Sequence, residues 1–224
     1  MDKKFAIFDM DGTLVDSMGY WQRMEREYLA GRGAPSGPEL EALIARLKPM
    51  TLYDAARAFI AELGFSGTPE HIVAEMNGVM RRHYERDVPL KHGVKEYLRR
   101  LVRRGAALCT ASATSVPLVK LCLRRLGVDR EFRFMLSCEE VGASKNRPDV
   151  YFEAARRLGS APAETAVFED SLSALTTAKN AGFYAVAVYD AASASDWPAL
   201  RALADECVVD WSKAAAGQRG SDPI

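Results

Sequence analysis

The sequence predicts an α/β protein, in which a parallel sheet carries helices on both faces and a separate helical module is inserted near the start. The short apolar run Phe5–Phe8 ends directly at Asp9, which is typical of a buried parallel strand. Residues 17–87 show only helical patterns, and from Val88 onward strand and helix patterns alternate. Such alternation indicates right-handed crossovers and a sheet covered on both sides.

The composition is that of an ordinary globular protein, with 48% hydrophobic and 27% charged residues in a chain of 224. This length allows one or two domains. Lysine plus arginine and aspartate plus glutamate both number 30, so no overall basic field indicates a nucleic-acid partner. No apolar run is long enough for a signal peptide or a membrane span, which favours a cytoplasmic protein without a membrane partner. Nothing in the sequence requires more than a monomer.

The four cysteines give no sign of a disulfide framework or a zinc site. No two of them form a CxxC pair, and none lies at zinc-ligand spacing from a histidine. We therefore expect most of them to be buried, reduced thiols. They are Cys109, Cys122, Cys138 and Cys207.

Two aspartates follow the first predicted strand. Asp9 stands at its exit, where open α/β sheets bind ligands, and Asp11 lies two residues further on, so both side chains can face one crevice. Gly12 permits the sharp turn that brings backbone close to a ligand. The sequence therefore predicts a functional site at this edge of the sheet.

Four helical stripes follow in the inserted segment. Thr68 and Pro69 are start signals for the last of them, and Gly64 ends the one before. We predict a core domain of residues 1–16 and 88–216, a helical domain of residues 17–87 and a flexible, mostly polar tail of residues 217–224. The apolar stripes are Trp21, Met24 and Tyr28; Leu40, Leu43, Ile44 and Leu47; Leu52, Ala56, Phe59, Ile60 and Leu63; and Ile72, Val73, Met76, Val79 and Met80.

The second half of the chain alternates between short apolar runs and helical patterns. The predicted strands are residues 106–111, 132–136, 165–168, 184–188 and 206–209. The predicted helices are residues 93–104, a segment between Pro117 and Gly127, and residues 148–158 and 171–181.

Three later positions carry groups suited to phosphate chemistry. The Ser112 hydroxyl and the Ala113 N–H, at a strand exit, could bind a phosphate oxygen, although Thr110 is an alternative. Lys145, just before a predicted helix, would stabilise a transferring phosphoryl group. The adjacent acids Glu169 and Asp170 repel each other unless a cation lies between them, and Mg²⁺ prefers such oxygen ligands.

The stretch DMDGTLVDS, Asp9–Ser17, resembles the DxDGT(L/V)xDS signature of the haloacid dehalogenase (HAD) superfamily. The segment that begins at Lys145 is similar to its Lys-x-x-Pro-Asp element, and Glu169-Asp170 to its Glu-Asp-Ser variant. The resemblance implies a Rossmann-like core with a helical cap inserted after the first strand. It also implies that Asp9 is nucleophile and Mg²⁺ ligand, and that Asp11 is general acid/base with its carbonyl on the metal. Asp170 would be a direct ligand and Glu169 a direct or water-mediated one.

Within the superfamily the chain resembles the β-phosphoglucomutase-like subgroup, with two departures. Trp21 stands at about the place of the mutases' histidine, and Leu52 at about the place of an arginine that grips the distal phosphate; Lys48 could substitute for the latter. We therefore expect a Mg²⁺-dependent phosphatase that hydrolyses a small phosphorylated metabolite through an aspartyl-phosphate. A phosphosugar mutase remains the alternative.

A phosphorylation-sensing receiver module is a hypothesis from another functional class. Receiver domains also combine an acidic pocket, a phosphorylatable aspartate, a hydroxyl residue, a lysine and Mg²⁺. They are much shorter, place the acidic pair before the phosphoacceptor and have no inserted helices, so the order of motifs here argues against that class. Asp11 likewise argues against dehalogenase and phosphonatase chemistry, because those enzymes usually lack an acid at that place.

Overall fold

The computed structural model describes residues 3–34, 37–47 and 51–216. The chain divides into two compact units, Met1–Met18 with Val88–Ile224, and Gly19–Asp87. The domain boundaries predicted from the sequence were residues 1–16 with 88–216 for the core domain and residues 17–87 for the helical domain. Lys48 and the predicted flexible tail lie outside the described residues.

The first unit is built on a six-stranded sheet in which every recorded pairing is parallel, as predicted. The order β3-β2-β1-β4-β5-β6 places β1 at the centre, and the chain proceeds from it first in one direction and then in the other. Open α/β sheets bind ligands at such a switch point, beyond the carboxyl ends of the strands. The strands are β1 (Phe5–Phe8), β2 (Ala107–Ser112), β3 (Phe134–Ser137), β4 (Thr165–Glu169), β5 (Tyr184–Val188) and β6 (Glu206–Val208).

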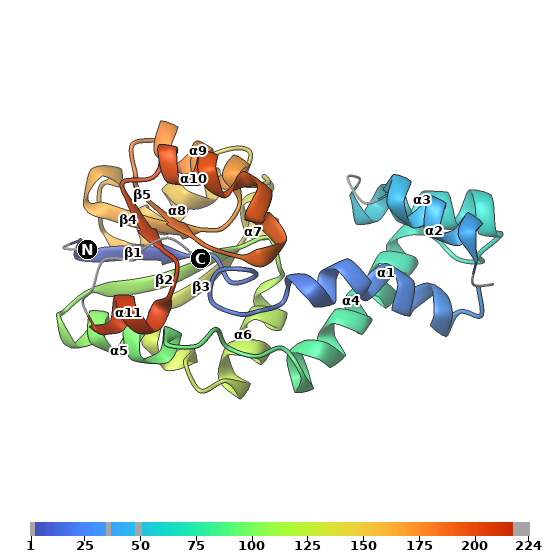
Figure 1. Cartoon of the computed structure of the whole chain (residues 1–224), viewed down its shortest axis with the longest axis horizontal. Coiled ribbons are helices and arrows are strands. Elements are labelled where there is room, and N and C mark those ends of the chain that lie inside the picture. The colour runs from blue at the N-terminus through green and yellow to red at the C-terminus, as the bar shows by residue number, and fades with distance from the viewer. Residues whose placement is uncertain (1–2, 35–36, 48–50, 217–224) are drawn as a thin grey trace. The chain divides into compact units, whose positions relative to one another are not determined.

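Helices cover both faces of this sheet (Figure 1). One face carries α5 (Val94–Arg103), α6 (Val116–Arg125) and α11 (Trp211–Ala216); the other carries α8 (Asp149–Leu158), α9 (Leu172–Asn180) and α10 (Trp197–Leu203). The short helix α7 (Cys138–Val141) follows β3, and three 3₁₀ turns cover Asp129–Glu131, Pro162–Glu164 and Ala191–Asp196. The sequence patterns did not predict α7, α10 or α11, since helices of four to seven residues leave little periodic signal.

Aromatic rings fill the space on the α5 side of the sheet. Phe8 of β1 stacks on Phe168 of β4 with ring centroids 4.2 Å apart, and Trp211 of α11 packs against both rings. On the other face, aliphatic residues of β1, β2 and β4 pack against α8. Burial of both faces accounts for strands that are apolar throughout.

The second unit consists of four helices with a core of their own. Thr51 and Thr68 cap α3 and α4 by accepting hydrogen bonds from the backbone, and Gly64 ends α3 in the left-handed conformation. Most buried positions of this unit belong to the predicted stripes, whose edges are half-buried. Leu29, Ala55 and Tyr84 are also buried, although the stripes did not include them. The helices are α1 (Met18–Gly31), α2 (Pro38–Leu47), α3 (Leu52–Leu63) and α4 (Pro69–Arg86).

The cysteines are free thiols, as predicted; Cys109 and Cys122 are buried, and the other two are half-buried. Within the described part of the chain, none of the helices has both the length and the apolar character needed to cross a membrane.

Candidate active site

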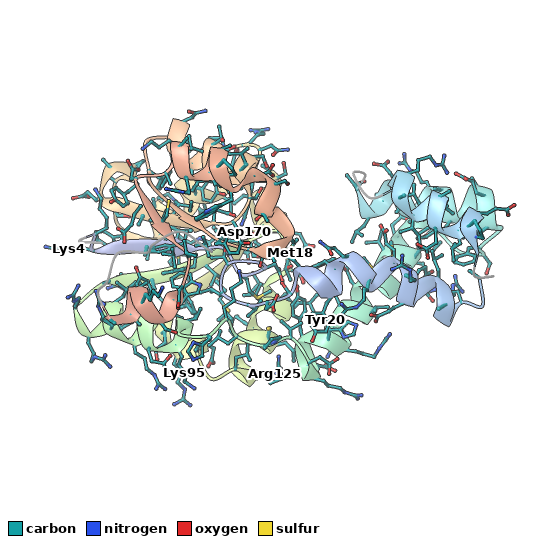
Figure 2. The ribbon with its side chains drawn as sticks, in the orientation of Figure 1. Lys4, Met18, Tyr20, Lys95, Arg125 and Asp170 are labelled. Carbon is teal, nitrogen blue, oxygen red and sulfur yellow. The ribbon has the colours of Figure 1, made fainter. Side chains whose placement is uncertain are left out.

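Three carboxylates meet beyond the carboxyl ends of β1 and β4. Oxygen atoms of Asp9, Glu169 and Asp170 all lie within 4.8 Å of one another. The three residues are only 7%, 1% and 6% exposed. Figure 2 marks Asp170 at the edge of the sheet opposite Lys4, which precedes β1. The structure therefore brings together three of the acids that the sequence singled out.

Strand pairing sets the positions of these acids. Phe8 lies beside Phe168 in the register of β1 and β4, and the Asp9 N–H donates to the Phe168 carbonyl at 3.0 Å. The residues that follow this pair, Asp9 and Glu169, consequently lie at the same level along the two strands. Two consecutive acids at the end of β4 then complete the cluster.

Lys145 lies between two of the carboxylates. Its Nζ donates to Asp9 Oδ1 at 2.5 Å and to Glu169 Oε1 at 2.6 Å. The lysine side chain is itself largely buried, and it supplies one positive charge beside three carboxyl groups. When all three acids are ionised, the cluster therefore has more negative than positive charge.

The pKa values of all three acids are raised. Burial raises the pKa of Asp9 to about 7, against the attraction of Lys145. Burial, with the charge of Asp9, likewise raises the pKa of Asp170 to about 7, and burial raises the pKa of Glu169. Burial alone would lower the pKa of Lys145, but the charges of Asp9 and Glu169 raise it above its ordinary value. The lysine therefore remains charged at neutral pH.

The turn after β1 holds Asp170 from one side. The Thr13 hydroxyl donates to Asp170 Oδ1 at 3.0 Å, and both groups are buried. Gly12 approaches so closely that a Cβ atom there would collide with the Asp170 carboxylate. A glycine at this position therefore leaves room for the Asp170 carboxylate, which follows the neighbouring strand β4.

The Asp11 side chain lies outside the carboxylate cluster. The hydroxyls of Ser17 and Thr114 donate to its two oxygens at 2.6 and 2.7 Å. The roles expected for Asp11, an acid/base carboxyl and a metal-bound carbonyl, remain predictions.

Ser112 is the last residue of β2 and is buried, and its Oγ accepts a hydrogen bond from the Thr114 N–H at 3.1 Å. Ala113, which follows it, is exposed. Thr110 lies deeper in the sheet beside Phe8, and its hydroxyl has no hydrogen-bond partner among the residues described.

Several contacts of the site were not predicted from the sequence. The Tyr151 hydroxyl on α8 donates to Glu169 Oε1 at 2.9 Å, and Thr114 holds Asp11. Tyr151 sits on the face of α8 that packs against the sheet, where a tyrosine cannot be told from an apolar core residue by its spacing. Thr13, by contrast, belongs to the DGT motif, and this motif could have indicated that Thr13 contacts the site.

The donors in this cluster fit a divalent cation. All three side chains offer carboxylate oxygens, the atoms that Mg²⁺ prefers, and they are buried beside only one positive charge, that of Lys145. Burial, together with neighbouring like charges, raises the pKa values of Asp9 and Asp170, and a dication would favour the ionised form of both groups. The residues present therefore suit Mg²⁺.

A buried acidic cluster with one lysine at the switch point of a parallel sheet, in a chain that also carries an inserted helical unit, is typical of a class of hydrolases. The sequence model of the haloacid dehalogenase-like hydrolase family matches residues 3–182. This chain belongs to that family, and it is a hydrolase whose relatives are named as phosphatases.

Named relatives extend over most of the chain. The chain is 27% identical to Hexitol phosphatase B of Escherichia coli, covering 82% of each protein. It is 30% identical to Fructose-1-phosphate phosphatase YqaB of Escherichia coli, covering 81% of this chain and 94% of the relative. The crystal structure of CbbY from Rhodobacter sphaeroides in complex with phosphate shares the fold, with a TM-score of 0.76 at 23% identity and coverage of 94% and 96%.

Proposed function

We propose that this protein is a Mg²⁺-dependent phosphatase that hydrolyses phosphomonoesters of small metabolites through an aspartyl-phosphate on Asp9. The observation that carries the proposal is the meeting of Asp9, Glu169 and Asp170 around one point, with Lys145 bonded to two of them. The names of the relatives, a hexitol phosphatase and a fructose-1-phosphate phosphatase, favour phosphorylated sugars or sugar alcohols as substrates.

In the proposed reaction, an Asp9 carboxylate oxygen attacks phosphorus, and the bond from phosphorus to the substrate oxygen breaks. Asp11 gives a proton to that leaving oxygen, then takes one from the water that attacks the phosphoryl group on Asp9. Inorganic phosphate leaves, and the Asp9 carboxylate is restored. Bound Mg²⁺ would offset charge on the phosphoryl oxygens.

The remaining predicted residues would bind the phosphoryl group. Lys145 is placed to stabilise negative charge beside Asp9, because its ammonium already bonds that carboxylate. Ser112 is favoured over Thr110, since Ser112 ends β2 whereas Thr110 lies within the sheet beside Phe8. The Ser112 hydroxyl and the Ala113 N–H would each donate to a phosphate oxygen.

We also propose that the helical unit Gly19–Asp87 is the cap that selects the leaving group, with Lys48 among its contacts. Trp21, which stands at about the place of a mutase histidine, donates its indole N–H to the Tyr84 hydroxyl at 3.0 Å within that unit. This packing role favours a hydrolase over a mutase.

The test is phosphate release from a panel of phosphate esters, with and without Mg²⁺. The panel contains fructose-1-phosphate, hexitol phosphates and β-glucose-1-phosphate with a bisphosphate primer. We expect Mg²⁺-dependent release from one or a few of the sugar or sugar-alcohol esters, and none from Asp9→Asn. Full activity of Asp9→Asn would refute the mechanism, and isomerisation of the glucose phosphate without net release would identify a mutase.

A further inference from the structure

The C-terminal helix α11 packs behind the site, on the α5 face of the sheet. Its first residue, Trp211, is only 3% exposed. The Trp211 ring lies 5.8 Å from the Phe168 ring and 4.9 Å from the Tyr97 ring, measured between centroids. Trp211 thus packs against β4, the strand that ends in Glu169.

A chain of two hydrogen bonds runs from Trp211 to the carboxylate cluster. The indole Nε1–H donates to the Thr13 carbonyl at 3.2 Å, and both groups are buried. The Thr13 hydroxyl donates in turn to Asp170 Oδ1 at 3.0 Å. Thr13 therefore accepts a hydrogen bond at its backbone carbonyl and donates one from its hydroxyl to Asp170, a proposed metal ligand.

Independent contacts hold α11 in place against α5. Arg100 Nη1 donates to the carbonyls of Ala214 and Ala215 at 2.8 and 2.6 Å. Gly93, at the start of α5, has φ +89°, and a Cβ there would collide with the backbone of Ser212. These contacts fix the position of α11, and therefore that of Trp211.

We propose that Trp211 is a positioning residue for the metal site. Its indole N–H fixes the Thr13 peptide, so that the Thr13 hydroxyl keeps the Asp170 carboxylate oriented toward the cation. Hydrogen-bond partners behind a ligand commonly set its orientation, and their loss commonly weakens metal binding about 10- to 100-fold. The inference rests on the proposed Mg²⁺-dependent function and deepens it.

The test compares two tryptophan variants of the full chain. Trp211→Phe keeps a packed ring and removes the N–H that donates to Thr13. Trp197→Phe is the matched control, because Trp197 is also buried and its Nε1 has no hydrogen-bond partner among the residues described. Mg²⁺ binding is measured by titration calorimetry, and the Mg²⁺ concentration for half-maximal phosphate release is measured separately.

We expect Trp211→Phe to weaken Mg²⁺ binding roughly tenfold in both measurements and to keep kcat near wild type at saturating Mg²⁺. Trp197→Phe should change neither value. In a Thr13→Val background, which removes the bond to Asp170, Trp211→Phe should cause little further loss of Mg²⁺ affinity.

A folded Trp211→Phe protein that binds Mg²⁺ as tightly as wild type would overturn the role of Trp211 and leave the proposed function standing. A wild-type protein that neither binds Mg²⁺ nor releases phosphate would instead overturn the proposed function.

A second measurement needs no altered site residue. In ¹⁵N-labelled wild-type protein, Mg²⁺ should shift the indole N–H resonance of Trp211 and leave that of Trp197 unchanged. An unmoved Trp211 resonance at saturating Mg²⁺ would contradict the inference, even if Trp211→Phe fails to fold.

Discussion

At the scale of single residues, the carboxylates near the site have different surroundings. Asp9 and Asp170 are buried among like charges, which raises the pKa of both groups. Asp11 accepts hydrogen bonds from two hydroxyls and lies outside the cluster. This contrast agrees with a division between metal-binding acids and a separate proton-transfer acid.

Replacement of Asp11 should separate the two steps of the proposed reaction. We expect Asp11→Asn to lower steady-state phosphate release about 10²- to 10⁴-fold, because no carboxylate then activates the attacking water. With p-nitrophenyl phosphate, whose leaving group needs little protonation, the variant should still give a burst of p-nitrophenol equal to the enzyme concentration. Rapid-quench measurements would detect this burst, and unchanged steady-state turnover would contradict the role.

The raised pKa values predict how pH affects the metal-free protein. The pKa of Asp9 and that of Asp170 are about 7 in the folded chain, above the ordinary value of 3.8. The folded state therefore binds these protons more tightly than the unfolded state, so its stability should fall as pH rises from about 4 through about 7. Mg²⁺ must displace the protons, so it should raise the melting temperature more at about pH 8 than at about pH 6. Equal Mg²⁺ effects at both pH values would contradict this account.

At the scale of secondary-structure elements, the contact between α5 and α11 depends on Gly93. Gly105 is a natural control, because it also has a positive φ, +83°, yet an added Cβ would meet no atom within 4 Å. We expect Gly105→Ala to reduce the free energy of unfolding by about 1–2 kcal/mol, the backbone cost alone. Gly93→Ala should cost at least a further ~1 kcal/mol, because it must also displace the Ser212 backbone. Denaturant titration measures both values, and equal losses would contradict the contact.

The elements that could be predicted are those with a local signature. The strand before Asp9 and the strand that ends in Glu169 begin as bounded apolar runs. The alternation of strands and helices alone predicts that their carboxyl ends meet. The bond from Trp211 to Thr13 joins residues 198 positions apart, and no local pattern encodes it. The bond from Tyr151 to Glu169 similarly depends on how α8 packs, which the sequence does not specify.

At the scale of the whole molecule, a net charge of zero conceals an uneven distribution. Residues 94–133 contain ten lysines and arginines but only three acidic residues, so this segment has a net charge of +7 and the rest of the chain −7. Arg103, Arg104 and Lys120 are among its exposed cations. Figure 2 shows Lys95 and Arg125 on the side of the first unit that α5 and α6 cover.

We therefore expect the protein to bind a sulfonate cation-exchange resin at neutral pH and low salt, despite its zero net charge. The triple variant Arg103→Glu, Arg104→Glu, Lys120→Glu should elute at much lower salt. A matched triple variant in the second unit, Arg57→Glu, Arg81→Glu, Arg82→Glu, makes the same change in net charge at other exposed sites and should elute later than the first. Identical elution of the two variants would show that overall charge alone governs binding.

The order of the strands also determines when the site can form during synthesis. β1 precedes both of its neighbours in the sheet, which begin at Ala107 and Thr165, and Trp211 is made later still. The helices of Gly19–Asp87 need no such distant partners and can fold while the core is still being made. The nascent chain must therefore keep its apolar first strand unpaired at least until β2 has been made. Pulse-labelled hydrogen exchange during refolding should accordingly show protection in α1–α4 before β1.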